Sequence, residues 1–407
     1  MEGAIKTARQ YFYETGQPQR TKYIGRKISY HGASLGTLGV AFNGPRRAPY
    51  EPILDQETFH HVSPPYARRF KAENETEEQF VERLRNELDA KFQELGPDTV
   101  IACEWRNRVS KFKLTSSSLF SVVAETVTGA SSGVVIPPKG YFKAVKSVCD
   151  KYGALLILDE VMCGMGREFS NCNQPYVTLH LSNRRWYSAR MGDLRRRNYP
   201  RYSRCRKRAW RRVNSNIPTH PSFSHPFRRY TPMGAVLVSK KVADGMRSRA
   251  GVWQHGYTYQ AHPLCCAASL AVQKILKKEN LLENIQIQGE LLGSLLRSRL
   301  LGPAAVAAPY VFDIRGKGGF WAVEFDITGK NALELGGKRF GPLVEDRCFK
   351  NGMMIMGMSG GANYEGTLGD HCMFAPAYNV TAEEITRIVD IFVQSVEEVI
   401  KTAAGNK

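Results

Sequence analysis

The sequence predicts an α/β protein in which a large domain, with a mostly parallel sheet flanked by helices, precedes a smaller C-terminal α+β domain. Stretches typical of strands and of helices alternate along most of the chain, as they do in parallel sheets with helical crossovers. One continuous apolar run, Ala154 to Leu158, has the length and composition of a strand buried on both faces. The 407 residues are enough for two domains.

The first part of the chain supplies the elements of the predicted large domain. A capping box, Thr76-Glu-Glu-Gln79, opens a helix with a regular apolar face, and Gly96-Pro97 ends it. Two further helices are expected over residues 2–14 and 140–152. Four runs are expected to be neighbouring strands of one sheet: Lys22–Ser29, Val122–Glu125, Leu155–Asp159 and Gly234–Ser239.

The second part supplies helices that link the domains and then the small domain. Helices are expected over residues 263–278 and 281–300, and strands are expected around Arg315-Gly-Lys-Gly-Gly319. A second capping box, Thr381-Ala-Glu-Glu384, opens an amphipathic C-terminal helix. The predicted boundaries are therefore 1–262 for the large domain, 263–300 for the linking helices and 301–407 for the small domain.

The composition predicts a reduced, cytoplasmic protein without a metal site. The nine cysteines show no CxxC pair, and His31, His255 and His371 lack an HxxxH spacing. No apolar run approaches the roughly 18 residues of a membrane span. The first residues also lack the apolar centre of a signal peptide.

The net charge of +19 comes mostly from one segment. Residues 184–230 contain 14 Arg, one Lys and one Asp, a net charge of +14, which leaves +5 for the rest of the chain. Such a run could bind nucleic acid, and a protein that uses the Arg-rich segment 184–229 in this way is one alternative. The run lacks heptads or a module that would present it, so no nucleic-acid partner is expected.

Asp159 ends the apolar run, at the edge of the sheet where open α/β proteins bind ligands. A buried carboxylate needs a cationic partner, and the protonated nitrogen of pyridoxal phosphate (PLP) is one such partner. A carboxylate that keeps this nitrogen protonated makes the ring an electron sink. A helix cap or a metal ligand would explain the same motif.

Five stretches, taken together and in this order, carry a family resemblance. They are Ser29–Gly32, Ala124–Gly129, Leu158–Val161, His255–Tyr259 with His262-Pro263, and Arg315–Gly318. The chain resembles a class III aminotransferase of the PLP-dependent fold-type I group. This resemblance implies PLP as the cofactor, and an amine or amino acid and an oxo acid as the small-molecule substrates.

The resemblance also implies which residues bind the cofactor: Tyr30, His31, Gly32, Glu125, Asp159, Val161 and Thr258. In this family pattern Tyr30 stacks on the ring, Gly32 lets the backbone approach it and Asp159 pairs with its nitrogen. Glu125 lies towards the ring hydroxyl and Val161 packs on the ring face. His31 belongs to the same motif as Tyr30.

Thr258 implies a homodimer, because in the family pattern its hydroxyl binds the phosphate of the neighbouring subunit's cofactor. Seen alone, Thr258 could be an ordinary turn residue and Tyr30 an ordinary aromatic at a strand end. Glu160 and His262 are expected to be structural.

The family's Schiff-base lysine is absent from its motif, so no catalytic residue is assigned. In the family this lysine lies in a turn resembling AKGLGGGY. Here Tyr230-Thr-Pro-Met-Gly-Ala-Val matches the end of the motif, but Arg228-Arg229 replace glycines. Lys207 is not offered as a substitute. The start of the chain resembles the helix after the family's phosphate-binding turn, so an N-terminal truncation is expected and mitochondrial import is left open.

A shifted reading frame explains the Arg-rich segment. The codons of residues 190–212, read one base later, permit A-W-E-T-F-G-A-G-I-T-P-D-I-H-A-V-A-K-G-L-G-G-G, which would join to Tyr230 and restore the motif. The codons of Cys103–Trp105 and of Arg167–Phe169 both permit a splice-donor sequence. Residues 104–121 and 168–229 are therefore expected to be mis-spliced, poorly packed inserts. A genuine diverged insert is the alternative.

The sequence thus predicts a transaminase fold whose activity is lost in the chain as written. The alternatives within the same fold are a PLP-dependent decarboxylase or aminomutase and a catalytically inactive binding protein.

Overall fold

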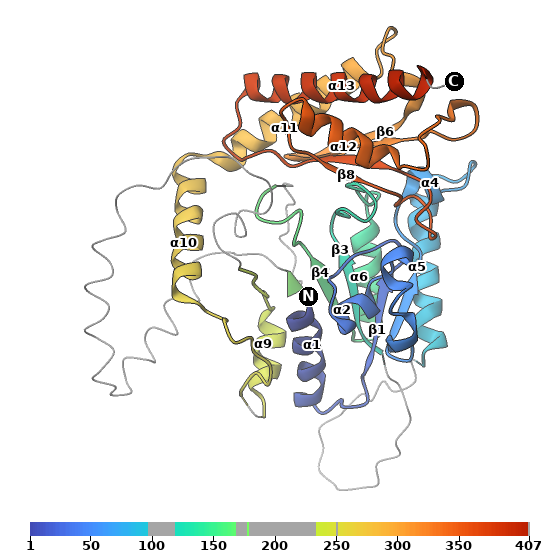
Figure 1. Ribbon diagram of the computed structural model, residues 1–407. Coiled ribbons are helices and arrows are strands. Elements are labelled where there is room, and N and C mark those ends of the chain that lie inside the picture. Colours follow the sequence, from blue (N-terminus) through green and yellow to red (C-terminus); the bar gives the residue numbers. More distant parts are fainter. Residues whose placement is uncertain (97–118, 168–176, 179–232, 250, 406–407) are drawn as a thin grey trace, which may run out of the picture.

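A computed structural model describes residues 1–96, 119–167, 177–178, 233–249 and 251–405 (Figure 1). Two sheets organise these residues, one of five parallel strands and one of four antiparallel strands. The predicted α/β architecture, with a mostly parallel sheet and a second α+β part, is therefore confirmed. Within these ranges no helix has both the length and the apolar character needed to cross a membrane.

The parallel sheet has the strand order β2-β1-β3-β4-β5. Its strands are β1 (Lys22–Arg26), β2 (Phe59–Val62), β3 (Leu119–Glu125), β4 (Leu155–Asp159) and β5 (Val177–Thr178). All five residues of β4 are buried, as expected for a strand covered on both faces. Three of the four predicted strands, β1, β3 and β4, are direct neighbours.

Helices cover both faces of this sheet, and the side chains of β4 alternate between them. Leu155 and Ile157 pack in the same cluster as α1 (Glu2–Glu14) and α9 (Lys240–Arg247). Leu156 and Leu158 pack with α5 (Glu77–Glu94) and α6 (Tyr141–Lys151) on the other face. The capping box at the start of α5 is formed, since the Gln79 amide donates to Thr76 Oγ1 (3.2 Å) and the Thr76 amide to Gln79 Oε1 (2.8 Å).

Two strand predictions need correction. The strand that begins at Lys22 ends at Arg26 rather than Ser29, because Ile28 adopts a positive φ of 55° that no strand can continue through. Gly234–Ser239 is not a strand. Its Val236 and Val238 pack against the α1 cluster, but the backbone of 234–239 pairs with no described strand.

The predicted inserts, 104–121 and 168–229, lie largely outside the described residues. The prediction is wrong for residues 119–121, which form the start of β3, and for Val177–Thr178, which form β5. Val177 and Thr178 pair with Ile157 and Leu158 because the edge of β4 offers unpaired backbone groups there.

The antiparallel sheet has the order β6-β7-β9-β8 and lies beneath helices in the upper part of Figure 1. Its strands are β6 (Val311–Lys317), β7 (Phe320–Phe325), β8 (Met356–Met358) and β9 (His371–Phe374). The helices that share its core are α11 (Leu281–Leu300), α12 (Phe340–Lys350) and α13 (Ala382–Gly405). The predicted capping box of α13 is formed through Thr381 and Glu384.

The other helices are shorter or lie between these elements. They are α2 (Leu35–Val40), α3 (Gly44–Arg47), α4 (Ala67–Phe70), α10 (Pro263–Lys278) and the short 3-10 helices Glu51–Ile53, Ala308–Tyr310 and Gly329–Asn331. Helices α10 and α11 have the predicted bounds, and Pro263 occupies the first position of α10, where its missing N–H costs nothing.

Gly289 allows α11 to pack directly on the β6–β7 turn. A Cβ at this position would lie 1.8 Å from the Gly318 carbonyl oxygen. We expect Gly289→Ala to lower the free energy of unfolding by about 1–3 kcal/mol through overpacking, although alanine favours a helix. Gly405→Ala in α13 is the control, since a Cβ there meets no atom within 4 Å. Equal urea-denaturation midpoints for the two variants would contradict the packing explanation.

Candidate active site

Three strands of the parallel sheet bring polar side chains together at their carboxyl ends. Glu125 and Asp159 are the last residues of β3 and β4, and they are register partners. His31 follows β1, and its Nδ1 lies 2.9 Å from Asp159 Oδ2. The structure therefore brings together His31, Glu125 and Asp159, which are far apart in the sequence.

The carboxylate of Asp159 is buried and held on both oxygens. Its Oδ1 accepts a hydrogen bond from the Val161 amide at 3.0 Å, while Oδ2 bonds to His31. The His31 side chain is also buried, and its Nε2 has no hydrogen-bond partner within the described part of the chain. A carboxylate held in this way is fixed in orientation at the ligand-binding edge of the sheet.

Glu125 is a second buried carboxyl group beside Asp159. Its Oε1 accepts a hydrogen bond from the Gly129 amide at 3.1 Å, and its Oε2 lies 4.0 Å from Arg26 Nη2. Burial raises the pKa of Glu125, and the nearby His31 and Arg26 oppose this increase only in part.

Three further predicted residues are close in sequence to the cluster: Tyr30 and Gly32 flank His31, and Val161 follows Asp159 by two positions. The Tyr30 ring is 36% exposed, and the guanidinium carbon of Arg46 lies 4.8 Å from its centroid. Gly32 has a φ of +135°, and a Cβ there would lie 2.6 Å from Thr37 Oγ1, so this turn requires glycine. Val161 is half-buried, two residues after the end of β4.

No hydrogen bond joins Thr258 to the cluster within the described part of the chain. It is exposed and begins a turn at 258–261. The neighbouring segment is fixed to α1, since Gln10 Nε2 donates to the Val252 carbonyl (2.6 Å) and Gln10 Oε1 accepts from the Gln254 amide (2.8 Å). The role predicted for Thr258 involves a second subunit, and it remains a prediction.

Arg26 was missed by the sequence analysis. It is buried in β1, and its Nη2 donates to the Glu125 carbonyl at 2.8 Å. The signal was available, because an arginine inside an otherwise apolar strand needs a buried acceptor or anion.

The described residues fit the ring of PLP at one point. Asp159 offers a fixed, buried carboxylate that suits a protonated ring nitrogen. Beside it, His31 Nε2 is buried without a partner among the described residues, so it can still form a hydrogen bond to a bound group. Among the lysines in the described ranges, none forms a hydrogen bond or ion pair with His31, Glu125 or Asp159. The same ranges contain no group of three His, Cys, Asp or Glu side chains that could hold a metal ion.

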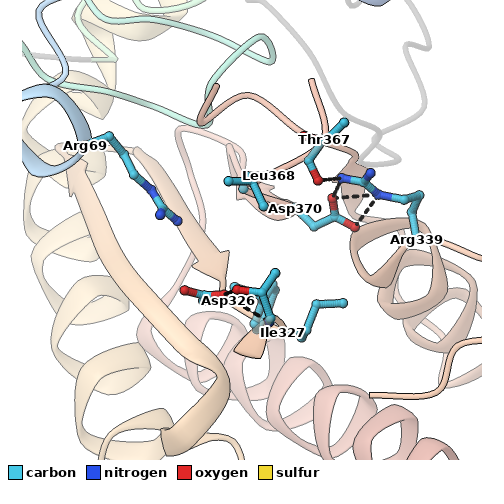
Figure 2. Close-up of a pocket in the computed structure, with 10 residues that line it drawn as sticks. Arg69, Asp326, Ile327, Arg339, Thr367, Leu368 and Asp370 are labelled. Atoms are coloured by element: carbon cyan, nitrogen blue, oxygen red, sulfur yellow. Dashed lines mark hydrogen bonds and ion pairs between the residues drawn. The ribbon is translucent and has the colours of Figure 1, made fainter. Parts of the chain in front are cut away.

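A cavity of about 210 Å³ lies elsewhere, beside the antiparallel sheet (Figure 2). Arg69 and Arg339 contribute to its walls with the 367–370 segment, and Arg339 Nε donates to Asp370 at 3.0 Å. The residues that line the cavity include none of those predicted to bind the cofactor.

Comparisons with known proteins identify the relatives of this chain. The family model described as "Aminotransferase class-III" matches residues 1–168 and 231–396, and it leaves unmatched nearly all of the predicted insert 168–229. An aminotransferase of Gibberella zeae is 37% identical, over 100% of this chain and 67% of that protein. Gamma aminobutyrate transaminase 2 of Solanum lycopersicum is 27% identical, over 98% of this chain and 71% of that protein.

Solved structures show the same fold. An (S)-enantioselective omega-transaminase from Thermomicrobium roseum has a TM-score of 0.71 and 27% identity, over 98% of this chain and 72% of that one. The omega transaminase of Pseudomonas jessenii in complex with PMP has a TM-score of 0.73 and 24% identity, over 99% and 74% of the two chains.

Proposed function

Because the chain belongs to the class III aminotransferases, a family of PLP-dependent enzymes, we propose that the cluster around Asp159 is its cofactor site. The reaction is transfer of an amino group from an amine or amino acid to an oxo acid. The buried hydrogen bond between His31 and Asp159, at the carboxyl end of the parallel sheet, is the observation that carries this proposal.

Each residue of the cluster has a distinct task in this proposal. Asp159 holds the ring nitrogen protonated, and PLP bound in this way supplies an electron sink. His31 orients the Asp159 carboxylate through Nδ1. Tyr30 stacks on the ring and Val161 packs on the ring face. Glu125 lies towards the ring hydroxyl.

For the chain as written we infer that turnover is absent. The family's lysine precedes a glycine turn, but here Arg228-Arg229 stand before Tyr230, and Lys207 is the only lysine between residues 152 and 239. A PLP enzyme without its lysine lacks the covalent attachment that holds and activates the cofactor.

A homodimer is part of this proposal. Helix α10 presents exposed apolar side chains, with Leu264 63% and Leu270 46% exposed, beside the segment that carries Thr258. Apolar area of this kind on a helix supports burial against a second copy, where Thr258 would serve the partner's cofactor. The division at 1–262, 263–300 and 301–407 remains a proposal, as does a cytoplasmic location, supported by the six free cysteines of the described ranges.

The reaction class is tested in a chain whose lysine turn is restored. We expect a ¹⁵N-labelled amino donor to yield its oxo acid while the label appears in the amino product of the acceptor. Release of CO₂ would instead indicate a decarboxylase, and an isomeric amine would indicate an aminomutase. Salt-sensitive DNA binding without amino transfer would favour the nucleic-acid alternative. Light scattering of the same sample gives the molar mass, and a monomer would refute the dimer.

A further inference from the structure

Arg315 joins the antiparallel sheet to a loop of the candidate active site. It lies in β6 and is 9% exposed. Its Nε donates to the Gly133 carbonyl and its Nη2 to the Ser132 carbonyl, both at 2.6 Å. Its Nη1 lies 2.7 Å from Glu324 Oε2. Its Nη1 also donates to Asp313 Oδ2 at 3.1 Å. One guanidinium group therefore binds two backbone carbonyls and two carboxylates at the same time.

Glu324 anchors Arg315 from the opposite side. It lies in β7 and is 1% exposed. Its other partners come from the segment around α4: Arg69 Nη2 lies 2.6 Å from Oε1, and the Tyr66 hydroxyl donates to Oε2. Arg69 Nε also donates to Oε1, at 3.0 Å. With four polar atoms converging on this buried carboxylate, Arg315 has little freedom to move.

The loop that Arg315 holds, residues 129–135, leads away from the end of β3. Its first amide, Gly129 N–H, donates to Glu125 Oε1 at 3.1 Å, and the Gly133 amide donates back to the Gly129 carbonyl at 3.0 Å. Val134 has a φ of +56°, a left-handed conformation that is costly for a β-branched residue. A loop with this conformation needs support from outside its own backbone.

We propose that Arg315 is a positioning residue for the candidate active site. Anchored on Glu324, it fixes the 129–135 loop through the carbonyls of Ser132 and Gly133, and the loop in turn keeps the Gly129 amide on Glu125. The inference deepens the proposed function and rests on it for the role of Glu125. In this proposal the antiparallel sheet, through Arg315, helps to hold the wall of the cofactor site in place.

A lysine at position 315 separates positioning from charge. Lysine keeps the positive charge for Glu324, but a single ammonium group cannot hold two carbonyls and a carboxylate with the geometry of the guanidinium fork. If Arg315 only neutralises Glu324, lysine suffices. If it positions the loop, the lysine variant should fold but hold residues 129–135 less firmly.

Hydrogen exchange of the full chain without added cofactor tests the proposal. We expect Arg315→Lys to raise the exchange rate of peptides covering 126–136 by about tenfold or more, with little change in α13. Arg339→Lys is the matched control, because Arg339 binds Asp370 on the same side of the molecule and no residue of the loop. Its 126–136 peptides should exchange as in the parent chain.

Two results would overturn the proposal: unchanged protection of the loop in Arg315→Lys, or an equal loss of protection throughout the antiparallel sheet. If Arg315→Lys does not fold, Glu324→Gln takes its place. This variant keeps the oxygen and the shape but loses the charge that holds Arg315, so the loop should again exchange faster than the rest. The readout needs no cofactor, so loop loosening without amino transfer in the restored chain would refute only the proposed function.

Discussion

The chain as written will show no measurable amino transfer when it is supplied with PLP, an amino donor and an oxo acid. The described residues provide a carboxylate for the ring nitrogen, but the motif that ends at Tyr230 has Arg228-Arg229 in place of glycines and contains no lysine. In enzymes whose catalytic groups act as a unit, loss of the nucleophile typically lowers the rate by roughly a thousandfold or more. We also expect weak PLP binding, because the lysine that would attach the cofactor covalently is missing from its motif.

The experiment compares this chain with one in which residues 190–229 are replaced by the 23-residue shifted-frame reading that contains A-K-G-L-G-G-G. The control carries the same replacement with alanine for that lysine, so the two differ in one side chain. Oxo-acid formation is measured for all. Robust turnover by the chain as written would refute the prediction. Lys207→Ala would then show whether Lys207 acts as the Schiff-base lysine.

Glu324→Ala should lower the free energy of unfolding by about 3–5 kcal/mol, the cost typical of removing one partner from a buried ion pair. The substitution leaves the buried Arg315 with the carboxylate of Asp313 alone, and it removes the acceptor of Tyr66 and Arg69. Urea denaturation followed by circular dichroism measures the change. Asp346→Ala is the control, since its pair with Lys350 is exposed on both sides and should contribute nothing measurable.

The same carboxylate gives the stability a defined pH dependence. Burial would raise the pKa of Glu324, but Arg315, Tyr66 and Arg69 outweigh burial, and the pKa is lowered in the folded protein. A lowered pKa means that the stabilisation is present above the pKa of the unfolded chain, roughly 4.3, and is lost as the pH falls through the folded value. The stability difference between the parent and Glu324→Ala should therefore narrow below pH 4. A constant difference down to pH 2 would contradict this assignment.

Local signals in the sequence predicted the elements that depend on local chemistry. The capping box at Thr76 and the proline at the start of α10 act within one turn of helix, and both helices begin where predicted. The buried strand ending at Asp159 was also predictable, because a short run of five apolar residues is typical of a strand buried on both faces.

Features that depend on distant partners were not predictable in this way. Gly234–Ser239 has the composition of a strand, but a strand also needs a neighbour with free hydrogen-bonding groups, which composition cannot supply. His31 was placed near the cofactor by resemblance, yet its hydrogen bond to Asp159 spans 128 positions and depends on the order of the strands. Glu324 gave no signal, because a single glutamate in a strand is usually solvated.

The charged groups around Glu324 also bear on the cooperativity of folding. Tyr66 and Arg69 belong to the part of the chain that carries the parallel sheet, whereas Glu324 and Arg315 belong to the antiparallel sheet. If the part with the parallel sheet melted alone, Glu324 would keep Arg315 but lose Tyr66 and Arg69, and Arg315 would lose the carbonyls of Ser132 and Gly133. Such a half-folded intermediate has a high free energy, because polar groups that are satisfied in the folded protein have lost their partners. The two sheets are thus thermodynamically coupled, so a fragment cut between them would be less stable than its share of the apolar core suggests.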